Sequence, residues 1–93
     1  MKYAVEMTGS FKHDFKVIKK RGYDLSLLYK VIDLLSNGES LPEKYRDHSL
    51  VGNFKGFREC HIQPDWLLIY KIDNDKLILL LTSTGSHSDL FDL

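Results

Sequence analysis

Three histidines and one aspartate are the residues of this chain best suited to proton chemistry. His48 lies in a polar segment, and His61 lies in a β-prone run that Asp65 follows after a turn. His87 comes after the last β-prone run, in the stretch GSHSDLF. An imidazole readily donates and accepts protons, because its unperturbed pKa is about 6.5. If the fold brings these side chains together, they form a candidate acid–base site.

Two other interpretations of these residues stay open. Three histidines and an aspartate are possible zinc ligands, but their spacing fits none of the compact zinc motifs. The histidines can also lie separately on the surface without a joint role. Cys60 is expected to be a small core residue, because no sequence neighbour would stabilise a thiolate. Because the spacing makes zinc the less favoured interpretation, we expect neither a metal site nor a cofactor.

The first part of the chain predicts a strand followed by two helices. Residues 2–7 are β-prone and stop before a Thr-Gly pair. Ser10 offers an N-cap for a helix over 10–21, in which apolar residues recur at helical spacing until a glycine ends the pattern. Asp24 caps a second helix, which ends at Asn37-Gly38. Because the turn between them is short, the two helices are expected to pack as a hairpin.

The rest of the chain predicts a meander of three antiparallel strands. After a polar loop at 39–53, β-prone runs span 57–62, 66–72 and 76–84, and turn-forming residues separate them. The expected fold class is α+β, with an N-terminal strand and a helix hairpin packed on a mainly antiparallel, twisted sheet. Residues 1–93 are expected to form a single domain.

The strand that carries His61 presents different chemistry on its two faces. Side chains alternate along a strand, so Glu59 and His61 share one face while Arg58 and Cys60 share the other. The sequence does not fix the pairing register of the strands. The convergence of His61 with the other acid–base candidates is therefore a hypothesis at this stage.

The charges of the chain balance overall but are unevenly distributed. The 13 basic and 13 acidic residues give a formal net charge of zero, which indicates no particular partner. Lys16, Lys19 and Lys20 give the first helix a basic outer face. The longest apolar run, 77–81, is too short to cross a membrane, and the N-terminal residues lack the pattern of a signal peptide. With one cysteine and no membrane contact expected, the expected location is the cytoplasm.

Four short motifs follow one another in the second half of the chain: DHSL, GNFKGFR, HIQPDW and TGSH. Through them the chain resembles the YafQ branch of the RelE/ParE superfamily of bacterial toxins, and the helix hairpin ahead of them agrees with that family's architecture. The resemblance implies a RelE-like fold and a ribosome-dependent endoribonuclease that cuts mRNA. It also implies a DinJ/RelB-like antitoxin that silences the toxin within a hetero-oligomer.

The resemblance implies roles for individual residues. His87 is the expected general acid and His48 or His61 the general base, with Asp65 orienting a histidine or sharing the base role. At the position of a catalytic arginine in the family this sequence has Ser83, which implies attenuated cleavage. The resemblance also implies RNA contacts for Trp66 and Phe91, and the distribution of basic residues adds Lys55, Arg58, Lys16, Lys19 and Lys20 as expected RNA contacts.

Two other functions are compatible with the same fold. A non-catalytic module that binds an antitoxin or joins a repressor complex would explain Ser83, but it gives no reason for the histidines and the aspartate. A gyrase-directed toxin of the same superfamily needs no set of histidines and ranks lower.

Overall fold

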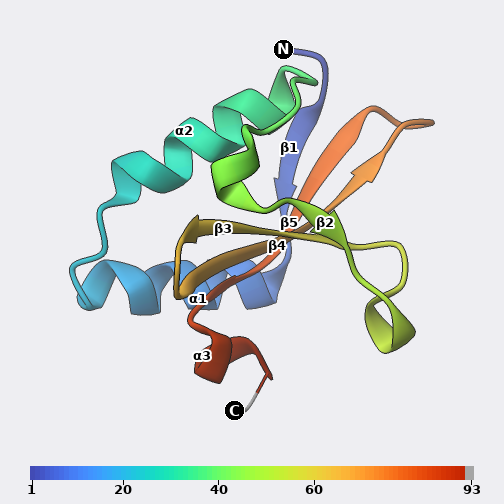
Figure 1. Ribbon diagram of the computed structural model, residues 1–93. Helices are drawn as coiled ribbons and strands as arrows, with labels where there is room; N and C mark the ends of the chain where they lie inside the picture. Colours follow the sequence, from blue (N-terminus) through green and yellow to red (C-terminus); the bar gives the residue numbers. More distant parts are fainter. Residues whose placement is uncertain (92–93) are drawn as a thin grey trace.

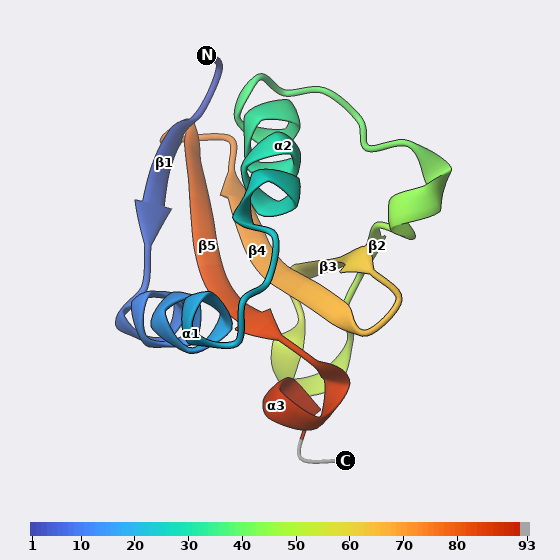
Figure 2. The same cartoon turned by 90° about the vertical axis from the view of Figure 1, so that its left-hand side faces the viewer.

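The computed structural model describes residues 1–91, in which two long helices lie on a five-stranded mixed sheet (Figures 1 and 2). The strand order is β1-β5-β4-β3-β2, with β1 parallel to β5 and the other pairs antiparallel. The expected α+β fold class is confirmed. The elements are β1 (Ala4–Met7), α1 (Gly9–Lys20), α2 (Leu25–Ser36), η1 (Glu43–Tyr45), β2 (His48–Ser49), η2 (Gly52–Phe54), β3 (Arg58–Gln63), β4 (Trp66–Asp73), β5 (Ile78–Gly85) and α3 (His87–Phe91).

Helix α1 begins at a different cap from the one expected. The Thr8 hydroxyl oxygen accepts a hydrogen bond from the backbone N–H of Phe11 at 3.0 Å, so Thr8 and not Ser10 is the N-cap. The same hydroxyl donates to the carbonyl of Thr82 at 2.8 Å and so joins the start of α1 to β5. This tertiary hydrogen bond, which the sequence does not reveal, favours Thr8 over Ser10 as the N-cap of α1.

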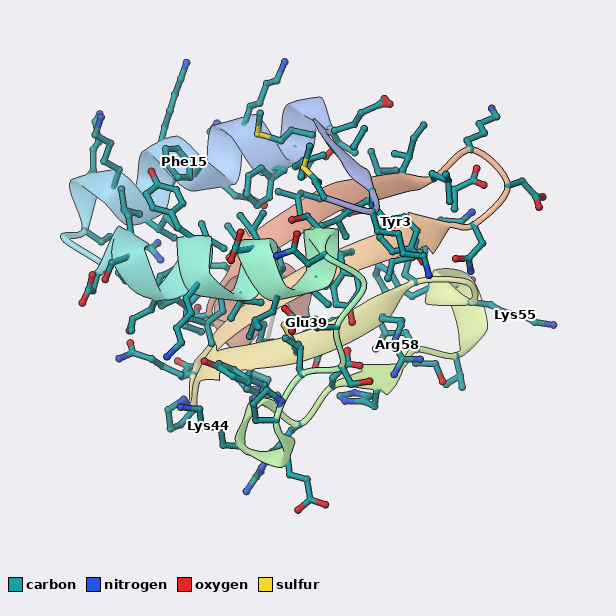
Figure 3. All side chains as sticks on the ribbon, turned by 90° about the horizontal axis from the view of Figure 1, so that it is seen from above. Tyr3, Phe15, Glu39, Lys44, Lys55 and Arg58 are labelled. Carbon is teal, nitrogen blue, oxygen red and sulfur yellow. The ribbon has the colours of Figure 1, made fainter. Side chains whose placement is uncertain are left out.

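The two helices form the expected hairpin and run side by side over the sheet (Figure 3). Gly22 adopts a φ of +79°, which ends α1 in the left-handed conformation. Asp24 caps α2 by accepting the backbone N–H of Ser26 at 3.1 Å. The rings of Phe15 on α1 and Tyr29 on α2 lie 6.5 Å apart, centroid to centroid.

The core lies between the helix hairpin and one face of the sheet. Cys60 is fully buried there, and burial raises the pKa of its thiol, which confirms its assignment as an inert core residue. Burying each large apolar side chain contributes roughly 1.5–3 kcal/mol, so this layer fixes the helices on the sheet. The cluster includes Phe11, Ile18, Leu28, Val31, Leu68, Tyr70, Leu79 and Leu81.

The segment predicted as a loop at 39–53 contains more structure than expected. His48 and Ser49 form the two-residue strand β2, which pairs with Glu59 and Arg58 of β3. A strand of two residues is too short to show an alternation of apolar and polar side chains. It can be recognised only by its pairing with β3. The prediction of a loop was wrong for this pair, and its pairing brings His48 onto the sheet.

Within residues 1–91, no helix has both the length and the apolar character needed to cross a membrane.

Candidate functional site

A row of side chains crosses the sheet face that the helix hairpin leaves uncovered. The register pairs His48 with Glu59, Glu59 with Ile69, and Ile69 with Ser83. Residues directly opposite one another in antiparallel strands project from the same face. His48, Glu59 and Ser83 therefore share one surface, and His61 joins them because it lies two positions beyond Glu59 on β3.

A β-bulge brings Ser83 into this row. Ile69 pairs with Ser83 but Tyr70 pairs with Leu81, so β5 has one extra residue, Thr82, at this point. The extra residue shifts the alternation of β5, so that Ser83 projects from the site face while Leu81 stays in the core. Bulges next to active sites commonly re-aim a side chain in this way.

Glu59 lies between two of the histidines. Its Oε1 atom is 3.6 Å from Nε2 of His48 and 3.6 Å from Nε2 of His61. The Glu59 residue is only 6% exposed, so its carboxylate lies at the floor of the site. Nδ1 of His48 is 2.8 Å from the carbonyl of Arg46, and because a carbonyl only accepts, Nδ1 carries the proton of that bond. In the neutral ring, Nε2 of His48 is then the basic atom, and it faces Glu59.

His87 and Asp65 meet at the same end of the sheet. Antiparallel pairing places Leu67, near the start of β4, beside Gly85 at the end of β5, so the turn before β4 lies beside the start of α3. Oδ1 of Asp65 accepts the backbone N–H of His87 at 3.0 Å and lies 2.7 Å from its ring Nδ1. These two hydrogen bonds, the backbone one first, lower the pKa of Asp65. The imidazoles of His61 and His87 are 5.6 Å apart, centroid to centroid. The structure thus supplies the register that the sequence left open.

The short helix α3, which carries His87, has a second attachment. Asp89 accepts the backbone N–H of Ser86 at 2.9 Å and binds Arg21, the C-cap residue of α1, at 2.6 and 3.2 Å. Figure 1 shows α3 on the lower side of β3 and β4, with α2 above them.

Trp66 lies in the core and does not face this site. It is 1% exposed, its Nε1 donates to Thr84 Oγ1 at 2.9 Å, and its ring packs edge-on against Tyr23 at 4.9 Å. A base cannot stack on a ring that is covered on all sides. The expected RNA contact of Trp66 is therefore corrected to a packing role.

Arg58 projects from the face opposite the histidines and is already paired. Its guanidinium donates to Asp47 Oδ2 at 2.9 and 3.3 Å, and the Tyr70 hydroxyl donates to the other oxygen of the same carboxylate. The expected RNA contact of Arg58 is corrected accordingly. Arg58 also cannot supply the charge that is missing at Ser83.

The other expected RNA contacts are accessible. Lys16, Lys19 and Lys20 are exposed on α1, and Lys55 is exposed after η2, where Figure 3 shows it pointing away from the sheet. Phe91 is half-buried at the end of α3 and meets Phe54 edge-on, with centroids 5.9 Å apart.

Five residues of this region were not among the predicted site residues: Glu59, Phe54, Arg21, Ser86 and Asp89. Strand alternation already placed Glu59 on the face of His61, so its carboxylate could have been included. Phe54 and Arg21 gave no such signal, because only tertiary contacts bring them to α3. Within residues 1–91, no three His, Cys, Asp or Glu side chains are arranged to hold a metal ion.

A helix hairpin covers one face of the sheet and imidazoles and carboxylates gather on the other, and bacterial toxins of known structure share this fold. Residues 3–92 match the family model described as YafQ, a bacterial toxin of type II toxin–antitoxin systems, and the chain belongs to this family.

Several relatives cover nearly the whole chain. The mRNA interferase toxin YafQ of Escherichia coli strain K12 is 43% identical over 88 residues, which are 94% of each protein. A metal-bound toxin from Helicobacter pylori has a TM-score of 0.90 and 46% identity, with 96% of this chain and 99% of that one covered. YafQ in the E. coli DinJ–YafQ toxin–antitoxin complex has a TM-score of 0.87 and 38% identity, with 98% and 99% covered.

Proposed function

We propose that this chain is the toxin of a type II toxin–antitoxin pair and that it cuts mRNA on the ribosome, in the cytoplasm, by acid–base catalysis. The observation that carries the proposal is the hydrogen-bonded pair of His87 and Asp65 beside a second group, in which Glu59 lies between His48 and His61. Two separate imidazole centres on one open surface supply the acid and the base that RNA cleavage needs.

In the proposed reaction a base removes the proton of a ribose 2′-hydroxyl, and the 2′-oxygen attacks the adjacent phosphorus. The bond from phosphorus to the 5′-oxygen breaks, and the leaving oxygen takes a proton from the acid. The products are a 2′,3′-cyclic phosphate and a 5′-hydroxyl. This sequence consumes no water or cofactor, so the residues of the chain can supply every proton transfer.

His87 is the proposed general acid. Its Nδ1 is directed to Asp65, which leaves Nε2 free to carry the proton to the leaving oxygen. One carboxylate oxygen of Asp65 binds both the ring Nδ1 and the backbone N–H of His87, so the proposed role of Asp65 is to orient His87 and not to act as the base.

The proposed base is His48 or His61. Each presents Nε2 to the same Glu59 oxygen at 3.6 Å, so a ring that takes up a proton there forms an ion pair with that carboxylate. The His48 side chain is half exposed, whereas that of His61 is 15% exposed. Both rings therefore keep a route to the substrate.

Negative charge builds up on the phosphate oxygens in the transition state. Ser83 carries no positive charge that could stabilise it. Losing one electrostatic donor of this kind costs on the order of 10²- to 10³-fold in rate. Arg58, on the opposite face, is held by Asp47. We therefore propose that cleavage by this chain is attenuated, and that an arginine at position 83 increases it.

Substrate binding is assigned to the accessible groups around the site. Phe91 and Phe54 offer aromatic rings for base stacking, and Lys55 offers a cation beside them. Lys16, Lys19 and Lys20 on α1 are proposed to bind ribosomal RNA through its phosphates, so that association weakens as salt is raised.

The proposed protein partner is a DinJ/RelB-like antitoxin that forms a hetero-oligomer with this chain and covers the site. The E. coli relative in complex with DinJ supports this assignment. Co-expression with the neighbouring gene product should give a complex that purifies as one species and does not cleave mRNA.

One observation favours a second function. Because Ser83 replaces a charged catalytic group, the chain could serve only as a binding module for an antitoxin. The ordered pair of His87 and Asp65 argues for catalysis, since binding alone requires no such geometry.

The experiment that separates these functions maps mRNA ends by primer extension in a cell-free translation reaction. The chain and its Ser83→Arg variant are compared, with and without ribosomes. Cuts that require ribosomes and strengthen with arginine support the nuclease. The absence of cuts from both proteins would favour the binding module.

A further inference from the structure

Helix α3 carries His87 but is too short to hold its own position. It has five residues, whereas an isolated helix in water needs roughly 12–15 to be even marginally stable. The orientation of His87 therefore depends on what α3 is attached to. Asp65 provides one attachment, directly at His87.

The second attachment is a cluster that we call the α1–α3 clasp, made of Arg21, Ser86 and Asp89. Asp89 accepts the backbone N–H of Ser86 at 2.9 Å, and Ser86 Oγ accepts the backbone N–H of Asp89 at 3.1 Å, so the two residues cap the start of α3 reciprocally. Arg21 then binds both oxygens of Asp89, at 2.6 and 3.2 Å. A bidentate contact of this kind fixes direction as well as distance.

The clasp connects α3 to a rigid part of the molecule. The backbone N–H of Arg21 donates to the carbonyl of Val17 at 3.0 Å and so continues the last turn of α1. Phe11 and Ile18 of the same helix are buried in the core. Arg21 therefore fixes the short helix α3 relative to α1, which is well packed in the core.

The end of β5 approaches the clasp closely. A Cβ atom on Gly85 would lie 2.9 Å from Oδ2 of Asp89 and 3.0 Å from its Cβ atom. Gly85 also has a φ of +153°, which a residue with a side chain rarely adopts. Because Gly85 has no side chain, α3 can lie close against the end of β5. The clasp then holds α3 in that position.

The geometry points to Arg21 as a positioning residue: through Asp89 it holds α3 so that Nε2 of His87 faces the substrate while Asp65 holds Nδ1. This inference rests on the proposed function, in which His87 is the general acid. Arg21 itself touches neither substrate nor His87, so its effect should appear in the rate of cleavage and not in binding. A misplacement of about 1 Å far from the chemistry can cost 10²-fold in rate.

The test compares Arg21→Gln, Asp89→Asn and the double variant, with Lys12→Gln as a control that removes one exposed charge from the same helix. Single-turnover cleavage on ribosomes and the affinity for ribosomes are measured separately. We expect Arg21→Gln to lower the cleavage rate by roughly 10-fold or more with ribosome affinity within about twofold. The double variant should be little worse than either single variant, because both break one contact.

A second readout is independent of cleavage. The ¹⁵N NMR signals of the His87 ring report which nitrogen carries the proton and how uniformly the ring is held. Arg21→Gln should broaden or shift these signals, Arg21→Lys should restore them in part, and Lys12→Gln should leave them unchanged.

The outcomes distinguish the clasp from the proposed function. If the wild-type chain does not cleave but Arg21→Gln still disturbs the His87 ring, the proposed function fails while the clasp stands. Unchanged ring signals in Arg21→Gln would overturn the clasp. So would a loss of cleavage matched by Lys12→Gln, or one explained entirely by weaker ribosome binding.

Discussion

Nδ1 of His87 lies 2.7 Å from Oδ1 of Asp65, and the same oxygen accepts the backbone N–H of His87. One carboxylate therefore fixes both the ring and the backbone of the proposed general acid. The pairing of β4 with β5 makes this possible, because it sets the turn that holds Asp65 beside the residue that follows β5.

Replacing Asp65 by Asn should impair catalysis without unfolding the protein. The amide keeps an acceptor for the backbone N–H but loses the charge that directs Nδ1–H of His87, so the ring populates wrong orientations and tautomers. We expect cleavage to fall by roughly 10²-fold, within the usual range of a general acid–base contribution. Asp75→Asn, an exposed carboxylate in the turn between β4 and β5, is the matched control. Equal rates for both variants would contradict the orienting role.

Replacing Phe54 should weaken substrate binding. Phe54 is 41% exposed, and its ring meets that of Phe91 at a steep angle and not face to face, so part of the ring stays available to a base. Removing a stacking ring costs about 1–3 kcal/mol per base, so Phe54→Ala should raise KM by at least roughly fivefold. Phe54→Tyr should keep most of the affinity. Val51→Ala, at an exposed position just before the same η2 turn, serves as the control, and an equal rise in KM there would argue against stacking.

Lowering the pH should detach α3 from Arg21 and Asp65 before the core unfolds. The bonds from Arg21, first, and from Ser86 lower the pKa of Asp89 from 3.8 to about 2, and the bonds from His87 lower that of Asp65. Because both folded-state pKa values lie below the unfolded ones, these carboxylates stabilise α3 above about pH 4 and stop doing so as the pH falls through the folded values.

Two probes separate the local event from the global one. The amide NMR signals of Ser86 and His87 report on α3, and the fluorescence of the buried Trp66 reports on the core. The α3 signals should move between about pH 4 and pH 2, ahead of any change in the fluorescence. A single coincident transition would show that the two attachments do not act locally.

The sequence predicted the parts of this fold that depend on local patterns. The cap at Asp24, the stop at Gly22 and the meander all follow from neighbouring residues, and each is present. The cap at Thr8 and the bulge at Thr82 did not follow, because a bond between α1 and β5 joins the two features.

The candidate site was predictable by residue type but not by arrangement. Motif resemblance selected His48, His61, Asp65 and His87, and the structure brings them to one end of the sheet. The same resemblance assigned Trp66 to RNA, although burial is decided by packing that no motif encodes. Arg21 and Asp89 meet across 68 positions of sequence, so the clasp became visible only in three dimensions.

The most direct test of the catalytic account is the single-turnover rate of mRNA cleavage on ribosomes for the chain and its His87→Gln variant, with ribosome affinity measured in parallel. Glutamine keeps a polar side chain of similar reach but cannot serve as a general acid. We predict a fall of roughly 10²-fold or more in rate with little change in affinity. An unchanged cleavage rate in His87→Gln would remove His87 from the mechanism and contradict the account.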